Sequence, residues 1–241
     1  MKNSCELQKR HYNSQAAAAF DKNRWNANHL YKIEVIEGFV RKYCRKGSLR
    51  ILEVGGGTGL HAEHFLETEE ARVEEFLFCD LSEDMLAVAK KRLQKYEGKV
   101  SFIQSSAEEF RLPRKVDCIY ISGAMHHFEN PAKAVRNCYR HLLEGGVLIV
   151  CEPVVTNPYA WPRVLFMPEE HGQFWVTPGH IVKWMGVSRF AVLEKKWMHY
   201  KSSCRLFRFL LRLEKAPFMN WSAVMFAAAA RKGTAEGKAR V

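Results

Sequence analysis

The sequence predicts an α/β protein with a doubly wound, mostly parallel sheet and helices on both faces. Three observations lead to this prediction. Over residues 45–152, five apolar strand patterns alternate with helical patterns, as is typical of parallel sheets. A run of glycines within residues 55–59 separates the first strand from the helix that follows it. The polar residues suited to ligand binding come directly after strands, at the edge where open α/β sheets bind their ligands.

Length and composition are those of a globular chain that can bury a sizeable core. The 241 residues suit one large or one-and-a-half domains, and 47% of them are hydrophobic. No apolar run approaches the ~18 residues of a membrane span, and residues 1–12 carry no hydrophobic signal core. We therefore expect a cytoplasmic protein without a transmembrane segment. The seven cysteines form no C-x-x-C pair, so we expect reduced thiols.

A formal net charge of +11 leaves several kinds of partner open. Such a charge is compatible with nucleic acid, with an anionic membrane surface or with an ordinary solvated surface. The basic residues form five separate clusters, at residues 41–46, 90–95, 195–201, 205–212 and 231–240. Because no single block dominates, the sequence favours the solvated surface, and nucleic acid or peripheral membrane contact is the alternative. The sequence does not indicate an oligomeric state.

The segment ahead of the alternation is predicted to be helical. Residues 14–31 are rich in alanine and aromatic residues, Trp25 among them, and an amphipathic helix continues over residues 32–43. We assign residues 1–44 to an N-terminal helical cap. Its aromatic side chains can close over a ligand as a lid, or the helix can pack on the edge of the sheet, and the sequence supports both readings equally.

The first strand and the glycine turn form a ligand cradle. Residues 51–54 are apolar except for Glu53, which interrupts the run just before the turn. We expect the next helix to span residues 61–70, with Thr58 as its N-cap. Glycine lets a ligand approach the backbone closely, and the start of a helix presents free N–H groups. The glycines of the turn are Gly55, Gly56, Gly57 and Gly59.

The spacing of these glycines discriminates between cofactors. The pattern is G-x-G-x-G, whereas the dinucleotide pattern G-x-G-x-x-G would need a glycine where Leu60 stands. An acid inside the strand also suits a zwitterion better than a pyrophosphate. Glu53-x-Gly55-x-Gly57-x-Gly59 resembles motif I of class I S-adenosylmethionine-dependent methyltransferases. The resemblance implies a Rossmann-like, seven-stranded sheet with an antiparallel last strand, and S-adenosylmethionine as the cofactor.

Two later strand ends supply further candidate cofactor residues. The second predicted strand, residues 73–80, ends in Asp80. This carboxylate can accept hydrogen bonds from ribose hydroxyls, or it can mark the start of the following helix, and we favour the first role. Leu81 can pack on an adenine face. After the third strand, the resemblance implies adenine contacts from Ser106 and Ala107, although aspartate is common in the family where Ser106 stands.

The loop after the fourth predicted strand, residues 116–122, carries the candidate catalytic residues. Residues 123–128 resemble the leucine-His-His loop of the small-molecule branch of the family, with Met125 in place of leucine. His126 and His127 are therefore candidate general bases, since an imidazole titrates near neutrality. Alternatively, one of the two histidines only structures the loop, and at most one is expected to face a substrate.

The same region completes the predicted cofactor-binding core. Ser122 and Gly123, at the end of the fourth strand, are further candidate cofactor residues. A helix over residues 131–143 and a fifth strand over 147–152 follow, as in the resembling family. A metal ion on the two histidines and Glu152 would match no familiar ligand spacing, so no metal is expected.

Residues 153–231 are assigned to a substrate-binding insertion and to the completion of the sheet. The insertion, residues 153–175, is rich in proline and aromatic residues, which favours an apolar or ring-shaped acceptor. The candidate acceptor-binding residues are Trp25, Tyr159, Trp161 and Trp175. Further along, we expect a helix over 177–186, strands over 190–200 and 221–230, a basic helix over 203–213 and a disordered tail over 232–241.

Methyl transfer from a sulfonium is the leading functional prediction, with a small-molecule or a lipid- or glycan-intermediate acceptor. The reaction would proceed by in-line displacement in a dry pocket, where positioning supplies most of the acceleration. Two alternatives remain, an RNA methyltransferase and a non-catalytic partner subunit of the same fold. Only the charge supports the first, and the intact glycine motif together with Asp80 argues against the second.

Overall fold

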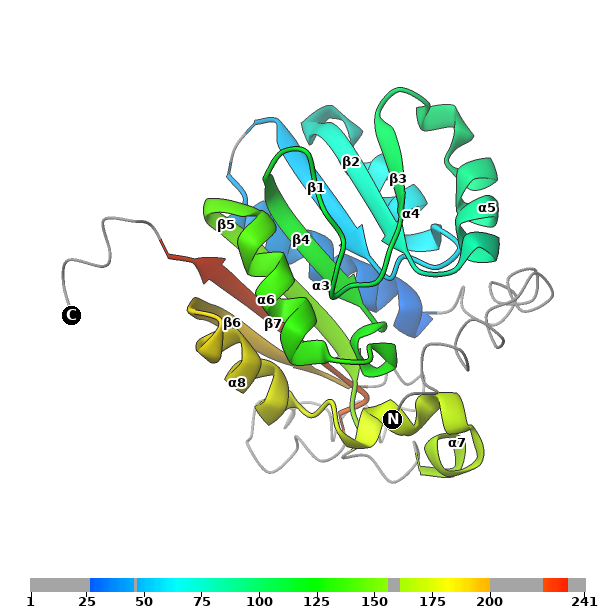
Figure 1. Cartoon of the computed structure of the whole chain (residues 1–241), viewed down its shortest axis with the longest axis vertical. Helices are drawn as coiled ribbons and strands as arrows, with labels where there is room; N and C mark the ends of the chain where they lie inside the picture. The colour runs from blue at the N-terminus through cyan, green and yellow to red at the C-terminus, as the bar shows by residue number, and fades with distance from the viewer. Residues whose placement is uncertain (1–26, 46, 156–160, 200–222, 234–241) are drawn as a thin grey trace, which may run out of the picture.

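The computed structural model describes residues 27–45, 47–155, 161–199 and 223–233. Figure 1 shows a central sheet flanked by helices. The strands are β1 Leu49–Val54, β2 Val73–Asp80, β3 Val100–Gln104, β4 Val116–Ser122, β5 Leu142–Pro153, β6 Phe190–Met198 and β7 Met225–Lys232. The helices are α3 Ala27–Tyr43, α4 Leu60–Glu69, α5 Glu83–Arg92, α6 Pro131–His141, α7 Trp161–Phe166 and α8 Pro178–Val187. Short 3-10 helices are η1 Glu70–Arg72, η2 Gln94–Tyr96, η3 Met125–His127 and η5 Pro168–Phe174.

The seven strands form one sheet in the order β3-β2-β1-β4-β5-β7-β6. The first five pair in parallel, whereas β7 is antiparallel to both β5 and β6. The predicted fold class, with its antiparallel last strand, is therefore confirmed. The order reverses between β1 and β4, and in open α/β sheets ligands bind at such a switch point, beside the carboxyl ends of the strands.

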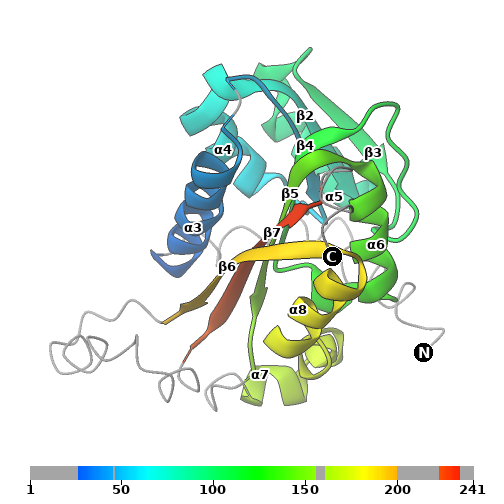
Figure 2. The ribbon, with the colours of Figure 1, turned by 90° about the vertical axis from the view of Figure 1, so that its left-hand side faces the viewer.

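Helices cover both faces of the sheet, as the side view shows (Figure 2). Residues of α3, α4 and α5 pack with one face of the strands in one apolar cluster, and residues of α6 and α8 pack with the other face in a second cluster. All six residues of β1 are buried. A central parallel strand contacts helices on both faces, which explains why its sequence reads as an almost continuous apolar run rather than an alternating one.

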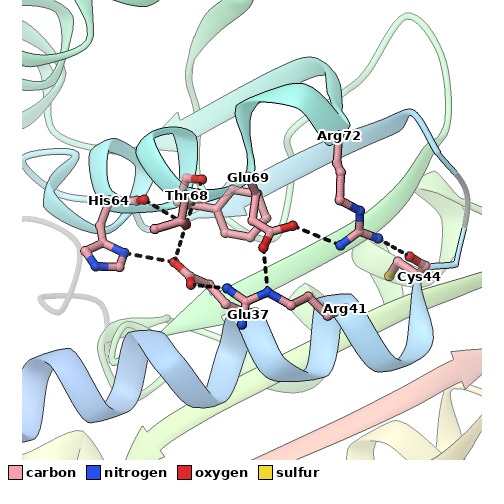
Figure 3. Close-up of polar contacts among 8 residues, drawn as sticks. Glu37, Arg41, Cys44, His64, Thr68, Glu69 and Arg72 are labelled. Atoms are coloured by element: carbon pink, nitrogen blue, oxygen red, sulfur yellow. Dashed lines mark hydrogen bonds and ion pairs between the residues drawn. The ribbon is translucent and has the colours of Figure 1, made fainter.

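A polar network joins α3 to α4 and fixes the described part of the N-terminal cap (Figure 3). The Glu37 carboxylate accepts hydrogen bonds from Arg41 and Thr68 and contacts the His64 ring at 2.9 Å. Arg41 and Arg72 both donate to Glu69. The contacts that join α3 to α4 pair residues 27 to 31 positions apart, so α3 is held on the core by specific pairs as well as by its apolar face.

The structure corrects several predicted boundaries. Thr58 is not the N-cap of α4, because the helix begins one residue earlier, at Leu60, and Gly59 in a left-handed conformation precedes it without a side-chain cap. The predicted helix over 131–143 ends at His141, where β5 begins. The insertion, for which no element was predicted, contains α7 and η5.

The predicted tail also begins too early. Lys232 is the last residue of β7, and its buried ammonium donates to the Leu142 carbonyl at 2.9 Å. Residues 234–241 lie outside the described part of the chain, as do the predicted basic helix over 203–213 and most of the predicted helix over 14–31. The five cysteines of the described residues are free thiols, and all are buried.

Candidate cofactor and acceptor site

A cavity of about 150 Å³ lies at the carboxyl ends of the central strands. It is lined by the turn after β1, by the ends of β2 and β4 and by the loop after β3. Every predicted cofactor residue except Gly59 lines it, namely Glu53, Gly55, Gly56, Gly57, Asp80, Leu81, Ser106, Ala107, Ser122 and Gly123. Residues that lie up to 70 positions apart in the sequence therefore meet in one concave site.

The turn after β1 needs glycine for conformation and for packing. Gly55 and Gly57 adopt φ angles of 72° and 60°, which L side chains rarely adopt. A Cβ at Gly55 would lie 2.5 Å from the Cβ of Ala124, and one at Gly56 would lie 2.3 Å from the Phe78 ring. Gly59 has a different role from the one predicted, because it faces Ala89 of α5 and permits close contact between α4 and α5.

Asp80 lines the cavity and also organises its wall. One carboxylate oxygen accepts a hydrogen bond from Gly57 N at 2.8 Å, and the other accepts one from Ser82 N at 2.9 Å. The Ser82 hydroxyl caps α5 by accepting from Met85 N. Burial raises the pKa of Asp80, and these backbone donors oppose the rise. A helix-cap role for Asp80 is therefore unnecessary, because Ser82 fills it.

The floor of the cavity carries a carboxyl group and an ammonium group, of which the sequence pointed only to the first. Glu53 is buried at the end of β1, and the pKa of its carboxyl group is raised to about 8 by burial, against the effect of the nearby Tyr120 hydroxyl and Lys32 ammonium. Lys32 comes from α3 and lies in the same cavity. We did not single out Lys32, although it is a charged residue four positions before the buried Ile36, on the apolar face of a predicted helix.

Several buried polar atoms around this floor lack a hydrogen-bond partner within the described residues. They include Glu53 Oε2, the Tyr120 hydroxyl, Ser122 Oγ and both ring nitrogens of His61. Burial lowers the pKa of His61 well below its ordinary value, so this ring is neutral at pH 7. Buried polar groups are normally paired. Glu53 and Ser122 line the cavity, and their free hydrogen-bonding capacity suits a polar ligand there.

The two adjacent histidines point to different surroundings. His127 lines the cavity, whereas His126 is buried and is not part of the lining. His126 Nδ1 lies 2.7 Å from Glu152 Oε2, and its Nε2 lies 3.3 Å from Glu170 Oε2. Burial lowers the pKa of His126, but the two carboxylates outweigh burial and raise it. This geometry favours His127 over His126 as a group that meets a substrate.

Glu152 holds the loop after β4 from beneath. Its Oε1 accepts hydrogen bonds from Ala124 N at 2.9 Å and Met125 N at 2.8 Å, while its Oε2 holds His126. The carboxyl group is fully buried, and each of its two oxygens has a hydrogen-bond partner. Nothing in the sequence around Glu152 indicates this role beyond its place at the carboxyl end of a strand.

The insertion contacts the same loop through η5. Gly172 lies so close to the backbone of His126 that a Cβ there would be 1.7 Å from the His126 carbonyl oxygen. Glu170 and Gln173, both buried, lie on the same short helix, and Gln173 Nε2 donates to Glu170 Oε2. The insertion is therefore joined to the cavity wall by a close backbone approach and by one carboxylate.

Two of the four predicted acceptor residues fall in the described part of the chain, and these two are not part of this cavity. The described parts of the insertion place Trp161 and Trp175 on the surface, 51% and 74% exposed, and neither lines the cavity. Trp25 and Tyr159 lie outside the described residues. Residues that line the cavity but were not predicted include His29, Glu108, Phe128 and Glu129, and all of these except His29 lie within or beside motifs that the sequence identified.

Comparisons with known proteins agree with this site. Residues 51–146 match the family model described as a methyltransferase domain. Over 108 residues the chain is 35% identical to the ubiquinone/menaquinone biosynthesis C-methyltransferase UbiE of Proteus mirabilis, an alignment that covers 43% of this chain and 42% of that protein. The homologue from Yersinia pestis is 34% identical over 113 residues. The chain thus matches less than half the length of these curated relatives.

Solved structures share the fold over most of the chain. The N-methyltransferase NodS from Bradyrhizobium japonicum, in complex with S-adenosyl-L-homocysteine, has a TM-score of 0.61 and 12% identity over 86% of this chain and 89% of its own. Phosphoethanolamine N-methyltransferase 2 from Haemonchus contortus has a TM-score of 0.62 and 17% identity over 89% of this chain and 59% of its own. The [4+2]-cyclase SpnF has a TM-score of 0.64 and 16% identity over 88% of this chain and 85% of its own.

Fold, site and sequence comparison point to one class of protein. Residues 51–146 match a methyltransferase domain, and the sheet around them is Rossmann-like, as expected of a class I S-adenosylmethionine-dependent methyltransferase. The resemblance seen in the glycine motif is therefore confirmed for this domain. Among the described residues, no helix is long and apolar enough to cross a bilayer.

Proposed function

We propose that this protein transfers the methyl group of S-adenosylmethionine to a small acceptor with an apolar or ring-shaped part. One observation carries the proposal: a carboxyl group, Glu53, and an ammonium group, Lys32, line the same cavity. A ligand with both an ammonium and a carboxylate is complementary to that pair. The amino-acid end of S-adenosylmethionine is such a zwitterion, whereas the pyrophosphate of a dinucleotide is not.

The remaining contacts are assigned from the residues that line the cavity. Asp80 is assigned to the ribose, since its oxygens already lie among backbone donors at the edge of the cavity. Leu81, Ser106 and Ala107 are assigned to the adenine end. The cofactor supplies an activated methyl group when bound, and the chain then has to position the acceptor and keep water away.

His127 is our candidate general base: it would accept the proton that an oxygen or carbon acid loses on methylation. It lines the cavity, and Phe128 beside it contributes apolar surface. The curated relatives are named as C-methyltransferases of ubiquinone and menaquinone biosynthesis. We propose an acceptor of the same broad kind, a small ring-bearing molecule, and we keep Trp161 and Trp175 as candidate acceptor contacts from the insertion.

Binding measurements test the cofactor half of the proposal. We expect S-adenosylmethionine and its demethylated product to raise the melting temperature, and NAD to leave it unchanged. A hundredfold excess over the dissociation constant should add about 2.7 kcal/mol to the free energy of unfolding. Equal shifts with NAD, or none with either sulfur compound, would contradict the proposal.

Transfer of label tests the acceptor half. Labelled cofactor is offered with total RNA and, separately, with a small-molecule extract, and we expect label in the extract. Label that appears only in RNA and vanishes at moderate salt would instead indicate an RNA methyltransferase, because phosphate contacts weaken steeply with salt. Cofactor binding without transfer to either would indicate a non-catalytic protein of this fold, and the fold of the cyclase SpnF shows that the architecture alone does not fix the reaction.

A further inference from the structure

Three potential metal ligands meet where the insertion contacts the loop after β4. The ligand atoms of His126, His127 and Glu170 all lie within 4.8 Å of one another. His126 and Glu170 are buried and His127 is half-buried. Two of these residues are adjacent in the sequence, but the third follows 43 positions later, so the group exists only in the folded chain. From this geometry we infer a binding site for a divalent transition-metal ion.

The distances suit an ion of the zinc type. Ligand bonds of ~2.0–2.2 Å in a tetrahedral site place neighbouring ligand atoms ~3.4 Å apart. His126 Nε2 and Glu170 Oε2 are separated by 3.3 Å. The His126 and His127 rings are 3.9 Å apart between centroids. Rotation of the half-buried His127 ring about its side-chain bonds is the adjustment that brings the third ligand atom into place.

The surroundings have the pattern that supports metal ligands. Glu152 lies 2.7 Å from His126 Nδ1, the ring nitrogen that faces away from Glu170. A carboxylate on the far nitrogen fixes the tautomer of a ligating histidine and raises its basicity. Gln173 donates to Glu170 in the same way that ligating carboxylates are held. Two of the three candidate ligands, His126 and Glu170, are therefore oriented by partners of their own.

The donor set also indicates which ion would bind. Two imidazoles and one carboxylate suit zinc and similar transition ions, whereas magnesium and calcium prefer sites made of oxygen. Three protein ligands leave one position open, as in catalytic zinc sites. Because His127 lines the cavity, the ion would lie at its border. On the proposed function, which this last step assumes, the open position would hold an anionic oxygen of the acceptor.

This site differs from the one that the sequence argued against. In the sequence, Glu152 was the third possible ligand. In the structure, its carboxylate is instead hydrogen-bonded to two backbone N–H groups and to His126. Glu170 takes its place because Gly172 lets η5 lie against the backbone of His126. A competing description needs no metal: a protonated His126 would simply bridge Glu152 and Glu170.

Metal titration distinguishes the two descriptions. Purified full-length protein is freed of metal with a chelator and titrated with Co²⁺, whose visible absorption is intense in a tetrahedral site, and then with Zn²⁺ as competitor. We expect one Co²⁺ per chain, displaced by Zn²⁺, and an affinity at least tenfold lower in Glu170→Gln and in His127→Ala. His171→Ala is the matched control, because His171 is exposed and adjoins Glu170, and it should bind as the unmodified protein does.

A control measurement separates failure of the metal site from failure of the proposed function. Thermal shifts with S-adenosyl-L-homocysteine, measured without metal, report whether each variant is folded and binds cofactor. No Co²⁺ binding to the unmodified protein, or equal binding by Glu170→Gln, would overturn the metal site and leave a bridging imidazolium. Loss of binding in His171→Ala would also overturn it, since a surface histidine would then be the ligand.

Discussion

Two glutamates occupy equivalent places in the sheet, at the carboxyl ends of β1 and β5, yet their surroundings are opposite. Glu53 and Glu152 are both buried. Glu152 accepts from two backbone N–H groups and from His126, and it does not line the cavity. Glu53 faces the cavity, retains an oxygen without a hydrogen-bond partner in the described chain, and has a pKa raised to about 8 by burial.

This difference in hydrogen-bond partners separates residues that stabilise the site from residues that are left to bind a ligand. A buried carboxylate costs free energy unless donors surround it. Glu152 meets that condition inside the protein, so it can hold the loop after β4 without a ligand. Glu53 does not meet it, and a cationic ligand is what would complete its surroundings. Four sets of variants test this contrast, in order of decreasing expected effect.

Removing the Glu152 carboxyl group should have the largest effect. Glu152→Ala leaves two buried N–H groups and the His126 ring without their acceptor, and breaking a buried pair in this way costs about 3–5 kcal/mol. Urea denaturation of the protein without ligand measures the loss. Glu144→Ala is the control on the same strand, because its carboxylate is 51% exposed and its contact with Lys232 should be worth less than about 1 kcal/mol. If the free energy of unfolding falls by less than about 1 kcal/mol in Glu152→Ala, Glu152 does not stabilise the fold more than Glu53 does.

Replacing the Glu53 carboxyl group by an amide should act in the opposite direction and raise the stability. The pKa of Glu53 is about 8 in the folded protein against an ordinary value of 4.5. Its carboxyl group therefore favours the folded state fully below pH 4.5, and that contribution is lost as the pH rises toward 8. One pKa unit corresponds to about 1.4 kcal/mol, so Glu53→Gln should raise the stability at pH 8 by about 2–3 kcal/mol, allowing for imperfect replacement by the amide.

Denaturation at two pH values checks this sign. Between pH 5 and pH 8 the unmodified protein should lose stability relative to Glu53→Gln, and the same variant should bind S-adenosylmethionine more weakly. A variant that is less stable than the unmodified protein at pH 8 would show that the Glu53 carboxylate is already paired in the folded state. Such a trade of stability for binding is common in residues that face a ligand.

Much of this contrast was visible in the sequence, because the strands and their ends are local features. The predicted strands 73–80 and 116–122 match β2 and β4 at both ends. Apolar runs of a parallel sheet are short and are ended by polar or glycine residues, so their boundaries are marked in the sequence. The glycine spacing and Asp80 followed from the same local reading.

The partners of those strand ends could not be predicted in the same way. Lys32 reaches Glu53's cavity from a helix that precedes the sheet, and Glu170 reaches His126 from an insertion 44 residues further on. These contacts depend on how helices and insertions pack, and no periodic pattern encodes that packing. Thr58 shows the limit in a local case, since a left-handed Gly59 took over the start of α4 from a residue with good capping chemistry.

The two ends of the cavity should respond to different parts of the cofactor. Lys32→Met is expected to weaken the binding of S-adenosylmethionine by about 1–2 kcal/mol, because a charged hydrogen-bond partner is lost. The binding of methylthioadenosine, which lacks the amino-acid part, should be unchanged. Asp80→Ala should weaken both ligands by about 1–3 kcal/mol, since both carry the ribose. Calorimetry with the two ligands measures the difference. Equal losses for both ligands in Lys32→Met would place Lys32 away from the amino-acid end.

The smallest expected effect on cofactor affinity belongs to the insertion. Trp161 and Trp175 are exposed and do not line the cavity, so Trp161→Ala and Trp175→Ala should change the affinity for S-adenosylmethionine by only a few tenths of a kcal/mol. If these side chains contact the acceptor, methyl transfer should fall while cofactor binding is preserved. The control is Phe128→Ala, whose ring lines the cavity and contacts the space beside Gly55, so it should affect cofactor affinity directly. Unchanged transfer in both tryptophan variants would show that the acceptor is selected by the cavity itself, through His127 and its neighbours, and that the exposed aromatic surface of α7 and η5 has another use.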